Sequence, residues 1–193
     1  MPIKSVFRFH YERTGMGRDA LFVDVALPEG KSLRIGTTHL ESLAPRVPVR
    51  PAQLAAAAKF MHEADASIIG GDMNAIQPFD KTLHLDNGLK DAYLESGGVE
   101  GAESGMTWGQ MAGAPSRRRF GLSRMDKLLY CGGLELAPTD GEGAPPAFET
   151  FGMDVVIELE NDDQREEFQD WGLEKPWATD HLGVKGRFRV ALS

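Results

Sequence analysis

Cysteine is almost absent from this chain, since Cys131 is the single one among 193 residues. One cysteine excludes an internal disulfide and a cysteine-based zinc cluster. No apolar run approaches the length of a membrane span, and the start, MPIKSVFRFHYERTG, contains no apolar signal-peptide core. We therefore expect an intracellular protein, nuclear or cytoplasmic, that has no membrane partner.

Positive charge is also scarce. The net charge of −8 argues against a broad, sequence-independent surface for nucleic acid. A local basic groove stays open, with the run SRRRFGLSR at 116–124 as its best candidate, although a solvated loop explains that run equally well. Hydrophobic residues make up 41% and charged residues 26% of the chain, so a single globular domain over 1–193 is expected.

Runs of apolar residues separated by turn residues predict an α/β protein. The segments 20–27 and 32–40 indicate a hairpin, and the alanine-rich segment 52–64, which has no Gly or Pro, indicates a helix. The remaining predicted elements are a strand at 66–71, a short helix at 88–96, strands at 123–131, 153–160 and 180–192, and an exposed helix or loop at 161–173. This order is typical of an α/β sandwich.

Polar side chains stand at four predicted strand ends. They are His39, Glu41 and Ser42; Asp72 and Asn74; Asp126; and Asp180 and His181. Each alone has an ordinary explanation as a turn residue, a cap or a buried hydrogen-bond partner. Together they are the residue types of phosphate and metal chemistry, because carboxylate and amide oxygens suit Mg²⁺ and histidine suits proton transfer.

A serine hydrolase is the other chemistry that Ser, His and Asp permit. The sequence has no G-x-S-x-G motif, and it also lacks the phosphate-binding P-loop and the G-x-G-x-x-G fingerprint. Any site must therefore be assembled by the fold from distant segments.

Five motifs, taken in order along the chain, resemble those of the endonuclease/exonuclease/phosphatase family. They are TTHLES (37–42), GGDMNA (70–75), TWG (107–109), RMDKLLY (124–130) and TDHLGV (179–184). The set is most similar to the tyrosyl-DNA phosphodiesterases of the second type. The resemblance implies a four-layer α/β/β/α sandwich and a phosphodiesterase that uses Mg²⁺, or Mn²⁺, on DNA ends with 5′-phosphotyrosyl-like adducts.

The resemblance also implies the catalytic residues. Asp72 would activate the attacking water, and Asn74 would help to hold that water and the phosphate. His181 would hold a phosphate oxygen while paired with Asp126, and His39 would contact the phosphate. The glycines before Asp72 would form a tight turn that lets its carboxylate project over the sheet edge.

Binding residues follow from the same resemblance. Asp180 and Glu41 would lie at the metal. Ser42 would contact the phosphate and Trp108 would line the groove. Relatives place an Arg after the Asn of GDxN, where this chain has Ala75, and the candidates to replace its positive charge are Arg46, Arg50 and Arg117–Arg119.

The chain departs from the family pattern before TTHLES. Family members carry an early Asn and a metal-binding Glu in a QE motif, and residues 1–36 match neither. The resemblance therefore implies a domain whose N-terminal half is largely missing, through truncation, degeneration or completion by a partner, and with little activity of its own. A non-catalytic binding module and a family member acting on another phosphodiester or phosphomonoester are the alternatives.

Overall fold

The computed structural model describes residues 1–43, 47–138 and 143–191, so the predicted binding residue Arg46 lies outside the described residues. The largest unit is a six-stranded sheet in the order β1 (Ile3–His10), β2 (Asp19–Ala26), β3 (Ser32–Thr38), β4 (Ala66–Asp72), β6 (Asp126–Gly132) and β5 (Lys90–Asp91). Strands β3 and β4 run parallel, and the other neighbours are antiparallel.

Two small sheets and five α-helices complete the described fold. The small sheets pair β7 (Leu134–Leu136) with β10 (Phe188–Val190) and β8 (Phe148–Phe151) with β9 (Gly183–Gly186). The α-helices are α1 (Arg50–His62), α2 (Leu83–Asp86), α3 (Ala92–Glu95), α4 (Ala114–Phe120) and α5 (Asp162–Asp170). No helix in the described ranges is long and apolar enough to cross a membrane.

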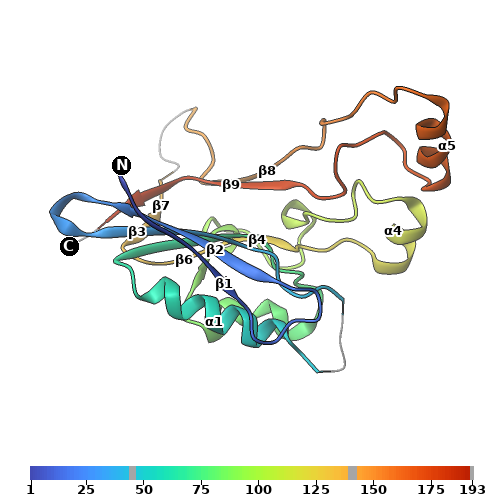
Figure 1. The fold of residues 1–193 in the computed structure, drawn as a ribbon. Coiled ribbons are helices and arrows are strands. Elements are labelled where there is room, and N and C mark those ends of the chain that lie inside the picture. The colour runs from blue at the N-terminus through green and yellow to red at the C-terminus, as the bar shows by residue number, and fades with distance from the viewer. Residues whose placement is uncertain (44–46, 139–142, 192–193) are drawn as a thin grey trace.

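The six-stranded sheet is covered by α1 on one face and only in part on the opposite face, where Val6, Leu21 and Ile35 of β1–β3 stay exposed (Figure 1). Helix α1 buries Leu54, Ala57 and Met61, which recur every three or four residues and pack on one face of the sheet. The opposite face packs against the small sheets, which contribute Phe148 and Phe188 to a second core. Helix, large sheet and small sheets are thus stacked, and the predicted α/β fold class is confirmed.

Several element predictions need correction. Strand β1 was not predicted, and the segment 88–96 divides into β5 and α3. The segment 153–160 forms no strand, and Val155 and Ile157 stay more than half exposed because this apolar run lies beyond β8. The final segment 180–192 is two strands, because the chain changes partner at Arg187 from β8 to β7.

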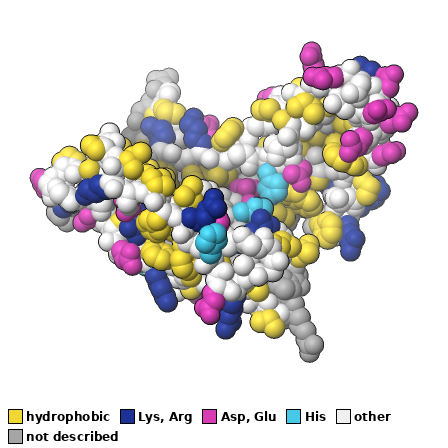
Figure 2. All heavy atoms as spheres, viewed as in Figure 1, with side chains coloured by type: hydrophobic (Ala, Val, Ile, Leu, Met, Phe, Trp, Pro, Cys, Tyr) yellow, Lys and Arg dark blue, Asp and Glu magenta, His cyan; other side chains and the backbone are white. Residues whose placement is uncertain are grey.

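Residues 152–180, called here the α5 lobe, project from the sheets between β8 and β9 (Figure 1). Acidic side chains gather on this lobe (Figure 2). The basic run at 116–124 does not form a single groove. Arg117, Arg118 and Arg119 are exposed on α4, whereas Arg124 is buried and ion-paired.

Candidate functional site

The register between β4 and β6 brings two carboxylates together. Asp72, the last residue of β4, lies opposite Asp126, the first residue of β6. Directly opposed residues of an antiparallel pair point to the same face, with Cβ atoms about 4.5–5.5 Å apart. The amide of Leu40 donates to the carbonyl of Asp72 at 2.9 Å, which holds the segment after β3, and with it His39, at the same sheet edge.

The glycines before Asp72 lie inside strand β4, so the predicted tight turn at this position is wrong. Gly71 has φ +143°, and a Cβ atom there would lie 1.9 Å from the carbonyl oxygen of Thr38. Glycine is required because β3 and β4 approach each other this closely. This approach places His39, which follows Thr38, beside Asp72.

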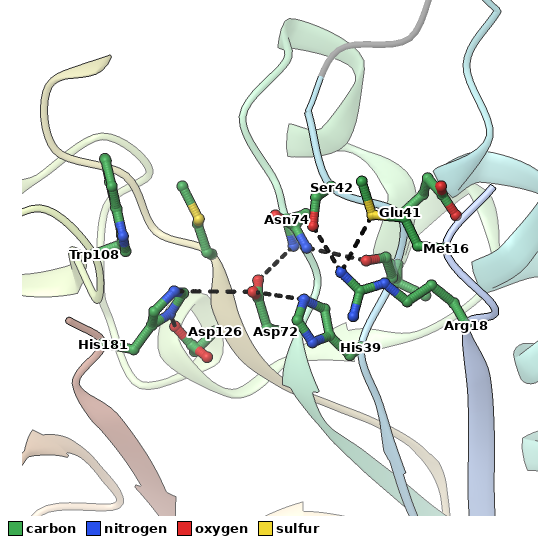
Figure 3. A network of polar contacts seen from close by, with 12 residues as sticks. Met16, Arg18, His39, Glu41, Ser42, Asp72, Asn74, Trp108, Asp126 and His181 are labelled. Atoms are coloured by element: carbon green, nitrogen blue, oxygen red, sulfur yellow. Dashed lines mark hydrogen bonds and ion pairs between the residues drawn. The ribbon is translucent and has the colours of Figure 1, made fainter. Parts of the chain in front are cut away.

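Two histidines flank Asp72 (Figure 3). His39 Nε2 lies 3.2 Å from Asp72 Oδ2, and His181 Nε2 lies 4.0 Å from the same oxygen. His181 Nδ1 shares a hydrogen bond of 2.7 Å with Asp126 Oδ2. The carboxylates are largely buried, at 15% and 16% side-chain exposure, whereas His39 is 48% exposed. The histidines therefore face solvent and the carboxylates orient them from behind.

Burial and charge shift the protonation of this cluster. Burial raises the pKa of Asp72, and the nearby charge of Asp126 raises it further. The hydrogen bond to Asp126 raises the pKa of His181 above its ordinary value, which favours the protonated ring. Burial lowers the pKa of His39, and the positive charges of Arg18 and His181 act in the same direction. The two histidines thus differ in their readiness to carry a proton.

Thr107 holds the start of β6 and the segment before β9 in place. Its hydroxyl accepts hydrogen bonds from the amides of Met125 and Asp126, at 3.1 and 3.0 Å. Its carbonyl accepts from the amide of Leu182 at 2.7 Å, next to His181. Thr107 is fully buried, so its role is positional. Sequence analysis missed it, although it begins the TWG motif.

The predicted groove residue Trp108 lines a cleft of about 650 Å³ between α4 and the α5 lobe. Its Nε1 donates to Asp180 Oδ2 at 2.9 Å, and Trp171 contributes a second indole to the same cleft. His181 and Asp126 line a neighbouring cleft of about 390 Å³. The space-filling view shows histidine side chains in the hollow between the sheets and the α5 lobe (Figure 2).

Asn74 braces the backbone beneath the cluster. Its backbone N–H donates to Asp72 Oδ1 at 2.8 Å, and its side-chain Nδ2 donates to the carbonyl of Leu40 at 3.0 Å. It is 6% exposed and has a positive φ of 46°. Asn74 therefore links the ends of β3 and β4, and its predicted contact with water and phosphate stays a prediction.

Arg18 was not predicted, yet its guanidinium reaches the site from the β1–β2 loop. Its Nη2 donates to Ser42 Oγ at 2.8 Å, and the group lies beside His39 in Figure 3. Glu41 anchors this loop, since its carboxylate accepts hydrogen bonds from Thr14 Oγ1 at 2.8 Å and from the amide of Gly15 at 3.0 Å. The cluster thus has a guanidinium on its His39 side.

One group of metal-ligating side chains stands out in the described ranges. Asp72, Asp126 and His181 each offer a ligand atom, and these atoms lie within 4.8 Å of one another. Carboxylate oxygens and an imidazole nitrogen suit a divalent cation in kind. The same side chains contact one another, so a cation would replace some of these contacts. Asp180 and Glu41 are not in this group, and their predicted ligand role stays a prediction.

Comparisons with known proteins show the family and the fold of the chain. The sequence matches the profile of the Endonuclease/Exonuclease/phosphatase family over residues 3–181. No curated protein sequence matches the chain at a significant level.

Solved structures share the fold. D. rerio TDP2, complexed with a single-strand DNA product, is similar with a TM-score of 0.66 and 20% identity, over 97% of this chain and 68% of that chain. TDP2 from Caenorhabditis elegans has a TM-score of 0.59 and 19% identity, over 94% of this chain and 49% of that one. The endonuclease/exonuclease/phosphatase from Beutenbergia cavernae has a TM-score of 0.62 and 19% identity, over 98% of this chain and 46% of that one. The chain thus spans between 46% and 68% of the length of these relatives.

Proposed function

Because the chain belongs to the endonuclease/exonuclease/phosphatase family, we propose that it is a metal-dependent phosphodiesterase acting on DNA ends that carry a 5′-phosphotyrosyl-like group. The observation that carries the proposal is the cluster in which Asp72 lies between His39 and His181, while His181 is held by Asp126. The similarity to a TDP2 structure that contains a DNA product supports DNA as the substrate.

The carboxylate of Asp72 accepts the proton of the attacking water. As the water oxygen forms its bond to phosphorus, the bond between phosphorus and the leaving oxygen breaks. The raised pKa of Asp72 makes it a stronger base than an exposed aspartate, while its largely buried position leaves one edge for the water.

His181 stabilises the negative charge that builds on the phosphate oxygens. Asp126 holds the ring by Nδ1, so that Nε2 faces the cluster and donates to a phosphate oxygen. His39 and Arg18 supply donors from the opposite side of Asp72. Arg18 thus supplies the positive charge that was expected from Arg46.

A divalent cation, Mg²⁺ or Mn²⁺, would supply further positive charge against the phosphate, and the carboxylates of Asp72 and Asp126 are the described groups that would hold it, while His181 keeps its proton and its role as a donor.

The test is hydrolysis of a 5′-phosphotyrosyl single-stranded oligonucleotide by the full chain, with Mg²⁺, with Mn²⁺ and with a chelator. We expect metal-stimulated turnover that is slow, because residues 1–36 match neither the Asn nor the metal-binding Glu of the family pattern. His181→Ala and Asp72→Asn should each lower kcat further, by about 10²–10³, as loss of one preorganised donor does. His10→Ala removes an exposed histidine on β1 and serves as the matched control. Binding of the oligonucleotide without cleavage under either metal contradicts the proposal and supports a binding module.

A further inference from the structure

A second cleft, of about 310 Å³, opens beside the catalytic cluster. One wall follows Asn74 directly and includes Ile76 and Lys81, and the opposite wall includes Glu100, Arg124 and Lys127. Lys127 follows Asp126 in β6, and successive strand residues point to opposite faces. The cleft, called here the Lys127 cleft, therefore shares the sheet edge with the cluster but lies on the other face of β6.

Lys127 is a buried cation without a close partner. Its side chain is 4% exposed, and its Nζ lies 3.8 Å from Asp91 Oδ2 and 4.0 Å from Glu100 Oε2. Both distances exceed that of a hydrogen bond, and its Nζ makes no hydrogen bond within the described residues.

The carboxylates around the cleft are already occupied by Arg124. This guanidinium contacts Glu100 closely and donates to Asp91 Oδ2 at 2.8 Å, while its buried Nε has no partner in the described ranges. Lys81 lies on the exposed rim, close enough to Glu100 to influence its pKa. Three cationic side chains thus face two carboxylates, and the cleft has a surplus of positive charge.

We propose that the Lys127 cleft is an anion-binding subsite that takes a phosphate group. The identity of this phosphate rests on the proposed function. In a bound DNA strand, the Lys127 cleft would take the phosphate next to the one held at the catalytic cluster. In a purely structural ion network, each charged group would find its hydrogen-bond partners within the network. Here Lys127 lines the cleft, and its Nζ makes no hydrogen bond within the described residues.

The experiment measures binding of inorganic phosphate to the full chain by isothermal titration calorimetry at constant ionic strength. Lys127→Met keeps the volume of the buried side chain and removes its charge. Lys81→Gln alters only the exposed rim, so it tests the cleft even where the first variant fails to fold. Lys59→Gln, an exposed lysine of α1, is the matched control, and His181→Ala reports binding at the catalytic cluster.

We expect the affinity for phosphate to fall about tenfold in Lys127→Met and about threefold in Lys81→Gln, as expected for losing one charged contact, buried or exposed. It should stay unchanged in Lys59→Gln. In His181→Ala, the binding that depends on Lys127 should persist although binding at the catalytic cluster is lost. Wild-type protein that binds no phosphate, lysine variants with unchanged affinity, or an affinity lost in His181→Ala alone would overturn the proposal. Because turnover is not measured, a chain that binds phosphate here without cleaving DNA contradicts only the proposed function.

Discussion

Replacing Gly71 by alanine should disrupt the sheet at the catalytic cluster. Its φ of +143° lies where residues other than glycine are strained by about 1–3 kcal/mol. The new Cβ would also lie 1.9 Å from the carbonyl oxygen of Thr38, so β3 and β4 must separate. Separation breaks the hydrogen bond from Leu40 to Asp72 and a neighbouring ladder bond, at about 1 kcal/mol each. We expect the free energy of unfolding to fall by about 3–5 kcal/mol.

Gly17→Ala is the matched control, because Gly17 also has a positive φ, of 69°, but a Cβ there meets nothing within 4 Å. That variant should lose only about 1–2 kcal/mol, from backbone strain alone. Urea denaturation followed by circular dichroism gives both values. If the two variants unfold at the same urea concentration, the close approach of β3 to β4 does not constrain the site, and the explanation for glycine at this position is wrong.

Three further substitutions test the supports of the site. Asp126→Asn should lower the pKa of His181, because the hydrogen bond to this carboxylate is the largest cause that raises it, and an unchanged NMR titration would contradict the pairing. Thr107→Val should cost about 1–3 kcal/mol in urea unfolding, because two backbone amides at the start of β6 lose their acceptor, whereas Thr107→Ser should restore most of the loss. Asp80→Asn should cost about 3–5 kcal/mol, because it leaves the guanidinium of Arg50, 1% exposed, without its carboxylate; a loss below 1 kcal/mol would show that the pair is dispensable.

Local patterns were sufficient for the elements that carry the site. The alanine-rich run predicted α1, and apolar runs bounded by turn residues predicted β2, β3, β4 and β6 to within a few residues. The apolar run at 153–160 misled the prediction, because within the described residues it makes only an isolated bridge, between Val156 and Trp177, and propensity alone does not form a strand. The local sequence also does not show where a segment leaves one paired strand for another, as the final segment does at Arg187.

The family resemblance supplied the site residues that geometry then brought together. Neither composition nor spacing shows that Asp72 lies opposite Asp126, because register depends on long-range pairing. Arg18 and Thr107 were missed for the same reason: each acts through contacts with segments remote in the sequence. Lys127 stands inside a recognised motif, but its burial without a close partner is visible only in the folded chain.

The change of strand partner at the end of the chain also bears on how the molecule folds. Asp126 and His181 are 55 positions apart, and Trp108 and Asp180 are 72 apart, so the cluster depends on contacts that form late. Isolated hairpins typically form in about 1–10 μs, and β1–β2 is such a local pair, so we expect His181 to reach Asp126 later, once β9 has paired with β8. Refolding followed at His181 should therefore lag behind refolding followed at the β1–β2 hairpin.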